Sequence, residues 1–115
     1  MADYFDTDDK KFTHVYRDNT PDILKVWGDF NTAIFQEGRE IPVKYRELAA
    51  IAVALTTQCP YCIEGHTAAA KKAGANENEI AEIAWVATAL RAGAAYTHGR
   101  LAFKLYEGAP EAHQH

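Results

Sequence analysis

Apolar residues recur every three or four positions through most of this chain, and they never alternate cleanly with polar residues over the length of a strand. Positions with that spacing lie on one face of an α-helix, whereas alternation would predict a sheet. The chain also lacks the Asn-Gly and Asp-Gly pairs that favour tight hairpins. The sequence therefore predicts an all-α fold, a compact bundle of about five to six helices. Two series show the helical spacing: Ile23, Trp27, Phe30 and Ile34, then Ile80, Ile83, Ala84, Ala87 and Leu90.

Threonine, proline and glycine mark the bounds of the first two predicted helices. Thr20 offers an N-cap, and Pro21 suits the first helical position because its missing N–H would have no partner there. This predicts a helix from residue 21 to about Glu37, with Gly38 as its C-cap. A second helix is expected over residues 43–57, where an almost continuous apolar run predicts burial nearly all round.

The third and fourth predicted helices carry stronger signals at their ends. Cys59 and the proline after it open a helix over residues 60–72, and Gly74 stops it. Asn76 caps the next helix, and Glu79 three residues later completes a capping-box signature. Both helices are therefore predicted with defined starts.

Two glycines, Gly93 and Gly99, interrupt the last segment. We therefore expect residues 92–106 to form a fifth helix or a bent continuation of the fourth. Glycine at these positions would also permit close contact with another helix. Trp85 and the series around Trp27 are expected to lie in the core or at an interface.

The chain has the length of one domain. With 115 residues, 48% of them hydrophobic and 24% charged, it can bury a core without a metal or a disulfide to support it. We expect residues 21–108 to form a single helical domain. An N-terminal arm over residues 1–20, with room for one helical turn, would precede it, and a solvated tail over residues 109–115 would follow. His113 and His115 in that tail are expected to be inert.

Charge and hydropathy argue against several classes of partner. The formal net charge is −4, which argues against nucleic acid. No apolar run approaches the roughly 20 residues of a membrane span, and residues 1–9 are acidic instead of forming a signal sequence. We therefore expect a cytoplasmic protein without a membrane partner. In a reducing compartment, a Cys-x-x-Cys pair is more often redox-active or metal-binding than structural.

The candidate site consists of Glu47, Cys59, Cys62 and His66. The last three are separated by three and then four positions, so they lie along one face of a helix that starts at Pro60. The N-terminus of a helix stabilises thiolate over thiol, which makes cysteine nucleophilic near neutral pH. His66, one turn beyond Cys62, is placed to exchange a proton with that sulfur, directly or through one water.

Glu47 belongs to the preceding predicted helix, among Tyr45, Leu48 and Ile51, on the side expected to face the interior. A buried carboxylate needs a partner, and His66 is the obvious candidate. A carboxylate on one ring nitrogen of histidine fixes the tautomer and raises the basicity of the other nitrogen. The two residues together therefore predict a proton relay.

These residues resemble the alkylhydroperoxidase D core of the carboxymuconolactone decarboxylase superfamily, over roughly residues 42–103. The resemblance rests on the spacing Glu-x11-Cys-x2-Cys-x3-His, on the Gly-Ala-Asn cap over residues 74–76, and on an Ala-rich helix ending in Ala-Tyr-Thr-His-Gly over residues 95–99. It implies a helical bundle of the alkylhydroperoxidase D type. Small members commonly form trimers or hexamers, and the apolar surfaces of so short a chain also predict a homo-oligomer.

The resemblance also implies roles for the four residues. Cys62 would attack a peroxide, Cys59 would resolve the product, and His66 with Glu47 would form the proton relay. The implied function is that of a thiol-dependent peroxidase or disulfide reductase, with a small hydroperoxide or disulfide as substrate, a dithiol reductant as partner and no cofactor. Family members often carry a histidine immediately before the second cysteine, where this chain has Tyr61.

Other interpretations of the same residues stay open. The cysteines could form a structural disulfide, or bind zinc with His66 and a fourth ligand such as His98 or His14. His98 could instead cap a helix, pack at a subunit contact or touch substrate. The chain could also be a cofactor-free decarboxylase or lactone-processing enzyme that uses His66, Glu47 or His98 for acid/base work, or a non-catalytic redox or metal sensor. Ile63 directly after the second cysteine excludes the haem-attachment signature.

Overall fold

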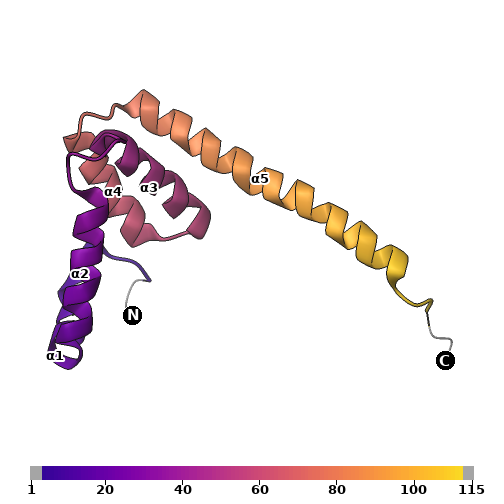
Figure 1. The fold of residues 1–115 in the computed structure, drawn as a ribbon, viewed down its shortest axis with the longest axis horizontal. Helices are drawn as coiled ribbons and strands as arrows, with labels where there is room; N and C mark the ends of the chain where they lie inside the picture. Colours follow the sequence, from indigo (N-terminus) through magenta and orange to yellow (C-terminus); the bar gives the residue numbers. More distant parts are fainter. Residues whose placement is uncertain (1–3, 113–115) are drawn as a thin grey trace.

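The computed structural model describes residues 4–112, and the chain is almost entirely helical within that range (Figure 1). These residues contain no strand. The prediction of an all-α fold is therefore confirmed, with five α-helices. In chain order the elements are the 3-10 helix η1 (Thr7–Thr13) and the α-helices α1 (His14–Asn19), α2 (Pro21–Phe35), α3 (Val43–Thr57), α4 (Pro60–Lys72) and α5 (Glu77–Gly108).

The compact bundle forms where α3 and α4 pack together with the first part of α5. Leu48 and Ile51 of α3, Ala70 of α4 and Ala75 just before α5 are buried at its centre. Ile51 is only 2% exposed, and burying a side chain of this size stabilises a fold by about 1.5–3 kcal/mol. This core fixes α3 against α4, the two helices that carry the candidate site. Partly buried side chains complete it: Leu55, Ile80 and Ile83.

α3 is buried along one face, so the prediction of burial nearly all round is wrong for the single chain. Its buried residues, Glu47, Leu48, Ile51 and Ala54, recur at helical spacing. Val53, in contrast, is 60% exposed. The physical reason is that α4 and α5 cover only part of the circumference of α3, and α2 contacts it little.

α2 ends two residues before the predicted end at Glu37. Its last helical residue is Phe35, and Gln36 is extended, with φ −67° and ψ 148°. The guanidinium of Arg46 donates to the carbonyl oxygens of Ile34 and Gln36, which a longer helix would have bonded itself. Gly38 is therefore not the C-cap. It lies in the following loop with φ +89°, a conformation that favours glycine.

The N-terminal arm contains more helix than the single turn that was expected. η1 begins with a capping box, in which the Asp6 carboxylate accepts from the N–H of Asp8 and the Asp9 carboxylate accepts from the N–H of Asp6. α1 then leads into α2 through Thr20, whose N–H donates to the carbonyl oxygen of Tyr16 at 2.7 Å. Residues 1–3 of the arm, and residues 113–115 of the tail with both of its histidines, lie outside the described residues.

The predicted end of α4 and start of α5 are confirmed. Gly74 stops α4 with φ +100°, and its N–H donates to the carbonyl oxygen of Lys71 at 3.1 Å. Asn76 accepts from the N–H of Glu79 at 2.8 Å, and Glu79 accepts from the N–H of Asn76 at 3.0 Å. Glu79 also forms an ion pair of 2.7 Å with Lys44. This pair joins the first turn of α5 to the first turn of α3.

α5 is one unbroken helix of 32 residues, so residues 92–106 continue the fourth predicted helix and do not form a separate fifth one. A glycine inside a helix costs only about 1 kcal/mol relative to alanine, and the many strong helix formers around these two positions outweigh that cost. A Cβ at Gly93 would meet nothing within 4 Å, and one at Gly99 would meet only the ring of Phe103 on the same helix. Neither glycine therefore makes a close contact with another helix of the described chain.

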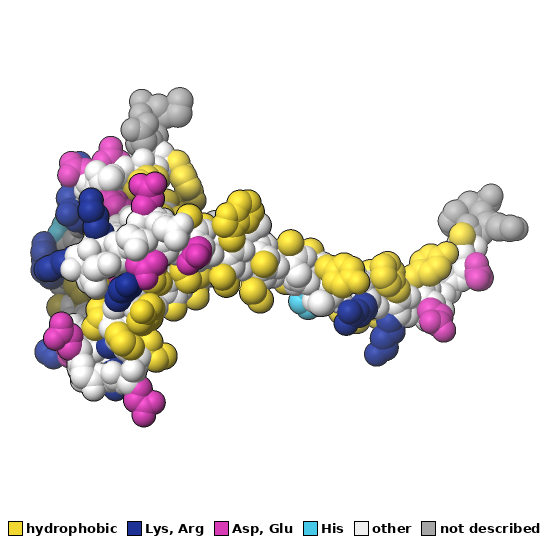
Figure 2. Space-filling model, turned by 90° about the horizontal axis from the view of Figure 1, so that it is seen from above, with side chains coloured by type: hydrophobic (Ala, Val, Ile, Leu, Met, Phe, Trp, Pro, Cys, Tyr) yellow, Lys and Arg dark blue, Asp and Glu magenta, His cyan; other side chains and the backbone are white. Residues whose placement is uncertain are grey.

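α5 extends far beyond the bundle (Figure 1). At 1.5 Å per residue it is about 48 Å long, and the Cα radius of gyration is 20.3 Å where a compact chain of this length would have about 13 Å. Apolar side chains lie along the projecting part (Figure 2), where Phe103 is 72% exposed. Trp27 and Trp85 are exposed too, so neither lies in the core of the single chain. Among residues 4–112, no helix is both long and apolar enough to cross a membrane.

Candidate functional site

The two cysteines lie at the turn between α3 and α4. Gln58 adopts the left-handed conformation, with φ 58° and ψ 51°, and the N–H of Cys59 donates to the carbonyl oxygen of Ala54 at 3.1 Å. Cys59 is the N-cap of α4, and its Sγ accepts from the N–H of Cys62 at 3.2 Å. Pro60 occupies the first turn, as predicted. Both sulfurs thus lie at the end of a helix where unpaired N–H groups favour negative charge.

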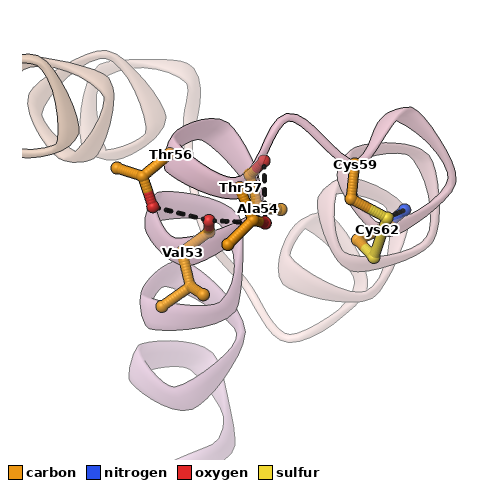
Figure 3. The surroundings of a disulfide bond; sticks show 6 residues. All are labelled: Val53, Ala54, Thr56, Thr57, Cys59 and Cys62. Carbon is orange, nitrogen blue, oxygen red and sulfur yellow. Dashed lines mark hydrogen bonds between the residues drawn. A yellow bond between two sulfur atoms is a disulfide. The ribbon is translucent and has the colours of Figure 1, made fainter. Parts of the chain in front are cut away.

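A disulfide joins Cys59 to Cys62, with the Cα atoms 5.3 Å apart (Figure 3). Both residues are partly exposed. Figure 3 also shows the hydroxyls of Thr56 and Thr57 turned back onto the last turn of α3, where each donates to the carbonyl oxygen of Val53. The cysteine pair is therefore oxidised in this structure. The two threonine hydroxyls bond the backbone of the last turn of α3, just before the pair.

Glu47 of α3 and His66 of α4 meet across the interface between these helices. Nδ1 of His66 lies 2.6 Å from Oε2 of Glu47. Glu47 is 5% exposed, and the side chain of His66 is 29% exposed. The predicted contact between the two residues is therefore confirmed. A carboxylate at Nδ1 favours the tautomer that carries its proton there, which leaves Nε2 available for proton transfer.

Phe35, the last residue of α2, lies against the ring of His66. The two ring centroids are 4.9 Å apart, with 33° between the ring planes. Phe35 was not predicted as a site residue, because the predicted helix ended later and Phe35 falls outside the apolar series that ends at Ile34. A third helix therefore contributes to the surroundings of the candidate site.

Tyr61, which lies between the two cysteines in sequence, contacts the N-terminal arm. Its hydroxyl donates to Oδ2 of Asp9 at 2.8 Å, and its ring meets the edge of Phe5 with centroids 4.9 Å apart. The hydrogen bond to the Asp9 carboxylate raises the pKa of Tyr61, and partial removal from water and the charge of Asp9 add to this effect. No spacing rule connects the arm with Tyr61, so this contact was not predicted.

The structure does not bring the two further candidate zinc ligands to the cysteine pair. His14 lies in the arm, with its Nδ1 3.3 Å from the carboxylate of Asp18. His98 is exposed on the projecting part of α5. Among residues 4–112, no group of three or more His, Cys, Asp or Glu side chains is arranged to hold a metal ion.

Sequence comparison links the chain to one protein family and to relatives in two bacteria. Residues 21–105 match the carboxymuconolactone decarboxylase family. A Paracoccus denitrificans protein named "Uncharacterized protein 4 in cox locus" is 43% identical over 74 residues, which cover 64% of this chain and 66% of that protein. An uncharacterized protein of Haemophilus influenzae is 50% identical over 70 residues, which cover 61% of this chain and 62% of that protein. The chain thus spans slightly less than two thirds of either relative.

A solved structure has a similar arrangement of helices. The crystal structure of a protein from Methanobacterium thermoautotrophicum has a TM-score of 0.68 and 29% sequence identity to this chain. The similarity covers 75% of this chain and 98% of that chain. The helical fold is therefore common to both proteins.

Proposed function

The chain belongs to the carboxymuconolactone decarboxylase family, and on that basis we propose that it is a thiol-dependent peroxidase or disulfide reductase. Its working residues on this proposal are Cys59, Cys62, His66 and Glu47. The observation that carries the proposal is the 2.6 Å contact between His66 and Glu47, one helical turn beyond a cysteine pair at the N-terminus of α4. A thiol beside a base that is oriented by a third group is the arrangement of an activated nucleophile.

In the peroxidase cycle, the thiolate of Cys62 attacks the terminal oxygen of a hydroperoxide. The S–O bond forms as the O–O bond breaks, and the alkoxide that leaves takes the proton that His66 had accepted from the thiol. The products are an alcohol and a sulfenic acid on Cys62. Glu47 stabilises the charged imidazole between the two proton transfers.

Cys59 then resolves the sulfenic acid. Its thiolate attacks the sulfur of Cys62, the S–S bond forms as the S–O bond breaks, and hydroxide leaves with a proton as water. An external dithiol reduces the resulting disulfide by thiol–disulfide exchange and is itself oxidised to a disulfide. The cycle uses no cofactor.

The same two sulfurs can reduce a small disulfide instead of a peroxide. The thiolate attacks one substrate sulfur, a mixed disulfide forms, and the second cysteine releases the reduced substrate. Both reactions need a supply of dithiol, which a reducing compartment provides, so the proposal includes a cytoplasmic location.

The family description favours a second candidate, a cofactor-free acid/base enzyme of the lactone decarboxylase kind. On that alternative, His66 and Glu47 would transfer protons on a substrate while the cysteines take no part. A non-catalytic redox or metal sensor is the third candidate, and it would carry titratable thiols or bound zinc but turn over no substrate.

One experiment separates these candidates. Consumption of an alkyl hydroperoxide, and of a small disulfide, is measured with excess dithiothreitol for the parent and for Cys59→Ser/Cys62→Ser. We expect multiple turnover in the parent and only the uncatalysed rate in the double variant. Catalysed turnover that persists in the double variant would exclude the thiol mechanism and favour the acid/base enzyme, and bound zinc in a parent without turnover would favour the sensor.

A further inference from the structure

Arg46 bonds to both sides of the connection between α2 and α3. Its Nε donates to the carbonyl oxygen of Ile41 at 2.8 Å, and its Nη2 donates to that of Gln36 at 2.7 Å. Its Nη1 donates to the carbonyl oxygen of Ile34. Because the guanidinium is a rigid planar fork, these bonds hold three carbonyl groups in one arrangement.

Phe35 lies between two of the residues that Arg46 holds, Ile34 and Gln36. The rest of α2 offers little to keep it in place, because its apolar face is open to solvent, with Val26 69% and Phe30 55% exposed. The last turn of α2 is instead bonded by two arginines outside the helix, Arg46 at the residues on either side of Phe35 and Arg39 at the carbonyl oxygen of Ala33.

The two residues that contact His66, Glu47 and Phe35, are both linked to one short segment of α3, residues 46–47. Glu47, whose carboxylate lies at Nδ1, directly follows Arg46 in sequence. Phe35, whose ring lies 4.9 Å from the imidazole, is held through the carbonyl groups on either side of it. The imidazole is therefore contacted at one ring nitrogen by Glu47 and, on another side, by the tilted ring of Phe35.

We propose that Phe35 is a positioning residue for His66 and that Arg46 holds Phe35 in place. The Phe35 ring limits rotation of the imidazole, so that Nδ1 stays on Glu47 and Nε2 stays available. The 4.9 Å between the ring centroids is also within the ~6 Å at which an aromatic ring attracts a cation, so the Phe35 ring stabilises the imidazolium that forms when His66 takes a proton. Only the effect on turnover rests on the proposed function, since the geometry exists without it.

The experiment measures the ring-nitrogen chemical shifts of His66 by NMR on the full, oxidised chain, which report the fraction of rings with the proton on Nδ1. Phe35→Leu is expected to lower that fraction, and Phe35→Tyr, which keeps the aromatic ring, to retain it. Phe30→Leu, an aromatic deletion on the exposed face of the same helix, is the matched control. In the reduced protein, alkylation of the thiols by iodoacetamide is expected to be about two- to fivefold slower for Phe35→Leu and unchanged for the other two.

Arg46→Lys keeps the charge but cannot form the three-carbonyl fork, so it is expected to lower the same fraction. A folded Phe35→Leu protein with the parent's tautomer fraction would overturn the role of Phe35. Arg46→Lys with the parent's fraction would overturn the role of Arg46. If circular dichroism shows Phe35→Leu to be unfolded, a Phe35→Tyr protein that differs from the parent in tautomer fraction overturns the proposal. The tautomer is measured without turnover, so an inactive parent would count against the proposed function alone.

Discussion

The hydroxyl of Tyr61 donates a hydrogen bond to Asp9, a residue 52 positions earlier in the chain. The ring of Phe5 packs against the same tyrosine. The N-terminal arm is therefore attached to one of the two residues between the cysteines, and a change at Tyr61 should act on the arm first.

Tyr61→Phe should loosen the arm, because the phenylalanine ring keeps the packing with Phe5 but has no hydroxyl to donate to Asp9. Trypsin at pH 8 is then expected to cleave after Lys10 or Lys11 several-fold faster than in the parent. Tyr45→Phe is the control, since Tyr45 is as exposed as Tyr61. Equal cleavage rates for Tyr61→Phe and the parent would mean that the hydrogen bond does not hold the arm.

The ion pair of Lys44 with Glu79 should make stability depend on pH in a defined direction. The hydrogen bond from Lys44, with a second from the N–H of Asn76, lowers the pKa of Glu79 from 4.5, and the same pair raises the pKa of Lys44 from 10.5. A carboxyl group with a lowered pKa stabilises the fold above its unfolded value and loses that effect as pH falls through the folded value. A lysine with a raised pKa stabilises the fold below 10.5 and loses that effect at higher pH.

Thermal unfolding of the parent and of Glu79→Gln, followed by circular dichroism, tests this dependence. We expect the parent to have the higher Tm near pH 7 and the difference in Tm to shrink as the pH falls below 4.5. Glu82→Gln, in the next turn of α5, is the matched control and should show no such trend. A Tm difference for Glu79→Gln that is constant from pH 7 to pH 3 would contradict the assignment.

The two cysteines should be unequal in reaction with peroxide. Cys59→Ser is expected to consume one equivalent of hydroperoxide and then stop, with a sulfenic acid on Cys62 that a carbon nucleophile traps, because no resolving thiol remains. Cys62→Ser is expected to consume none. Mass spectrometry of the trapped adduct locates the oxidised sulfur. The opposite pattern would exchange the roles, and full multiple turnover in both variants would exclude the thiol mechanism.

Glu47→Gln should slow turnover while leaving the fold intact. The amide keeps the volume of Glu47 but cannot stabilise a charged His66, and acid/base partners contribute about 10²–10⁴-fold to rates. The exposed Glu64→Gln on α4 is the matched control. A helical Glu47→Gln protein that turns over at the parent's rate would remove Glu47 from the mechanism.

We expect the chain to form a homo-oligomer, a trimer or a hexamer, because the apolar side chains on the outer part of α5 are uncovered in the single chain. Light scattering should give the mass of several chains, and Phe103→Glu should reduce it. Lys104→Ala, at the neighbouring exposed position, is the control. A stable parent monomer at micromolar concentration would refute this expectation.

Those parts of the structure that have local causes could be predicted from the sequence. The hydrogen bonds of Gly74, Asn76 and Glu79 join residues only a few positions apart. Residue type and spacing were therefore sufficient to predict where α4 ends and α5 begins. The contact of Glu47 with His66 followed because two consecutive helices each had a defined face and a buried carboxylate needs a partner.

The parts that were not predicted depend on residues far apart in the chain or on sums over a long element. Arg46, a residue of α3, bonds the carbonyl groups at the end of α2, and Asp9 in the folded arm accepts a hydrogen bond from Tyr61. No periodicity in the sequence predicts either contact. In α5, the cost of two glycines is small against the helix-forming tendency of the residues around them, so the two glycines alone could not decide between a separate fifth helix and a continuation of the fourth.

Because α5 extends so far beyond the bundle, we expect the stability of this protein to depend on its concentration. Helices in proteins owe most of their stability to the packing of an apolar face, and the large apolar side chains on the outer part of α5 are exposed in the single chain. If the chain forms the proposed homo-oligomer, the side chains of the outer part of α5 are covered only in the oligomer. The unfolding midpoint then depends on protein concentration by mass action. Dilution should then lower that midpoint, with unwinding that begins at the far end of α5 and reaches the bundle last.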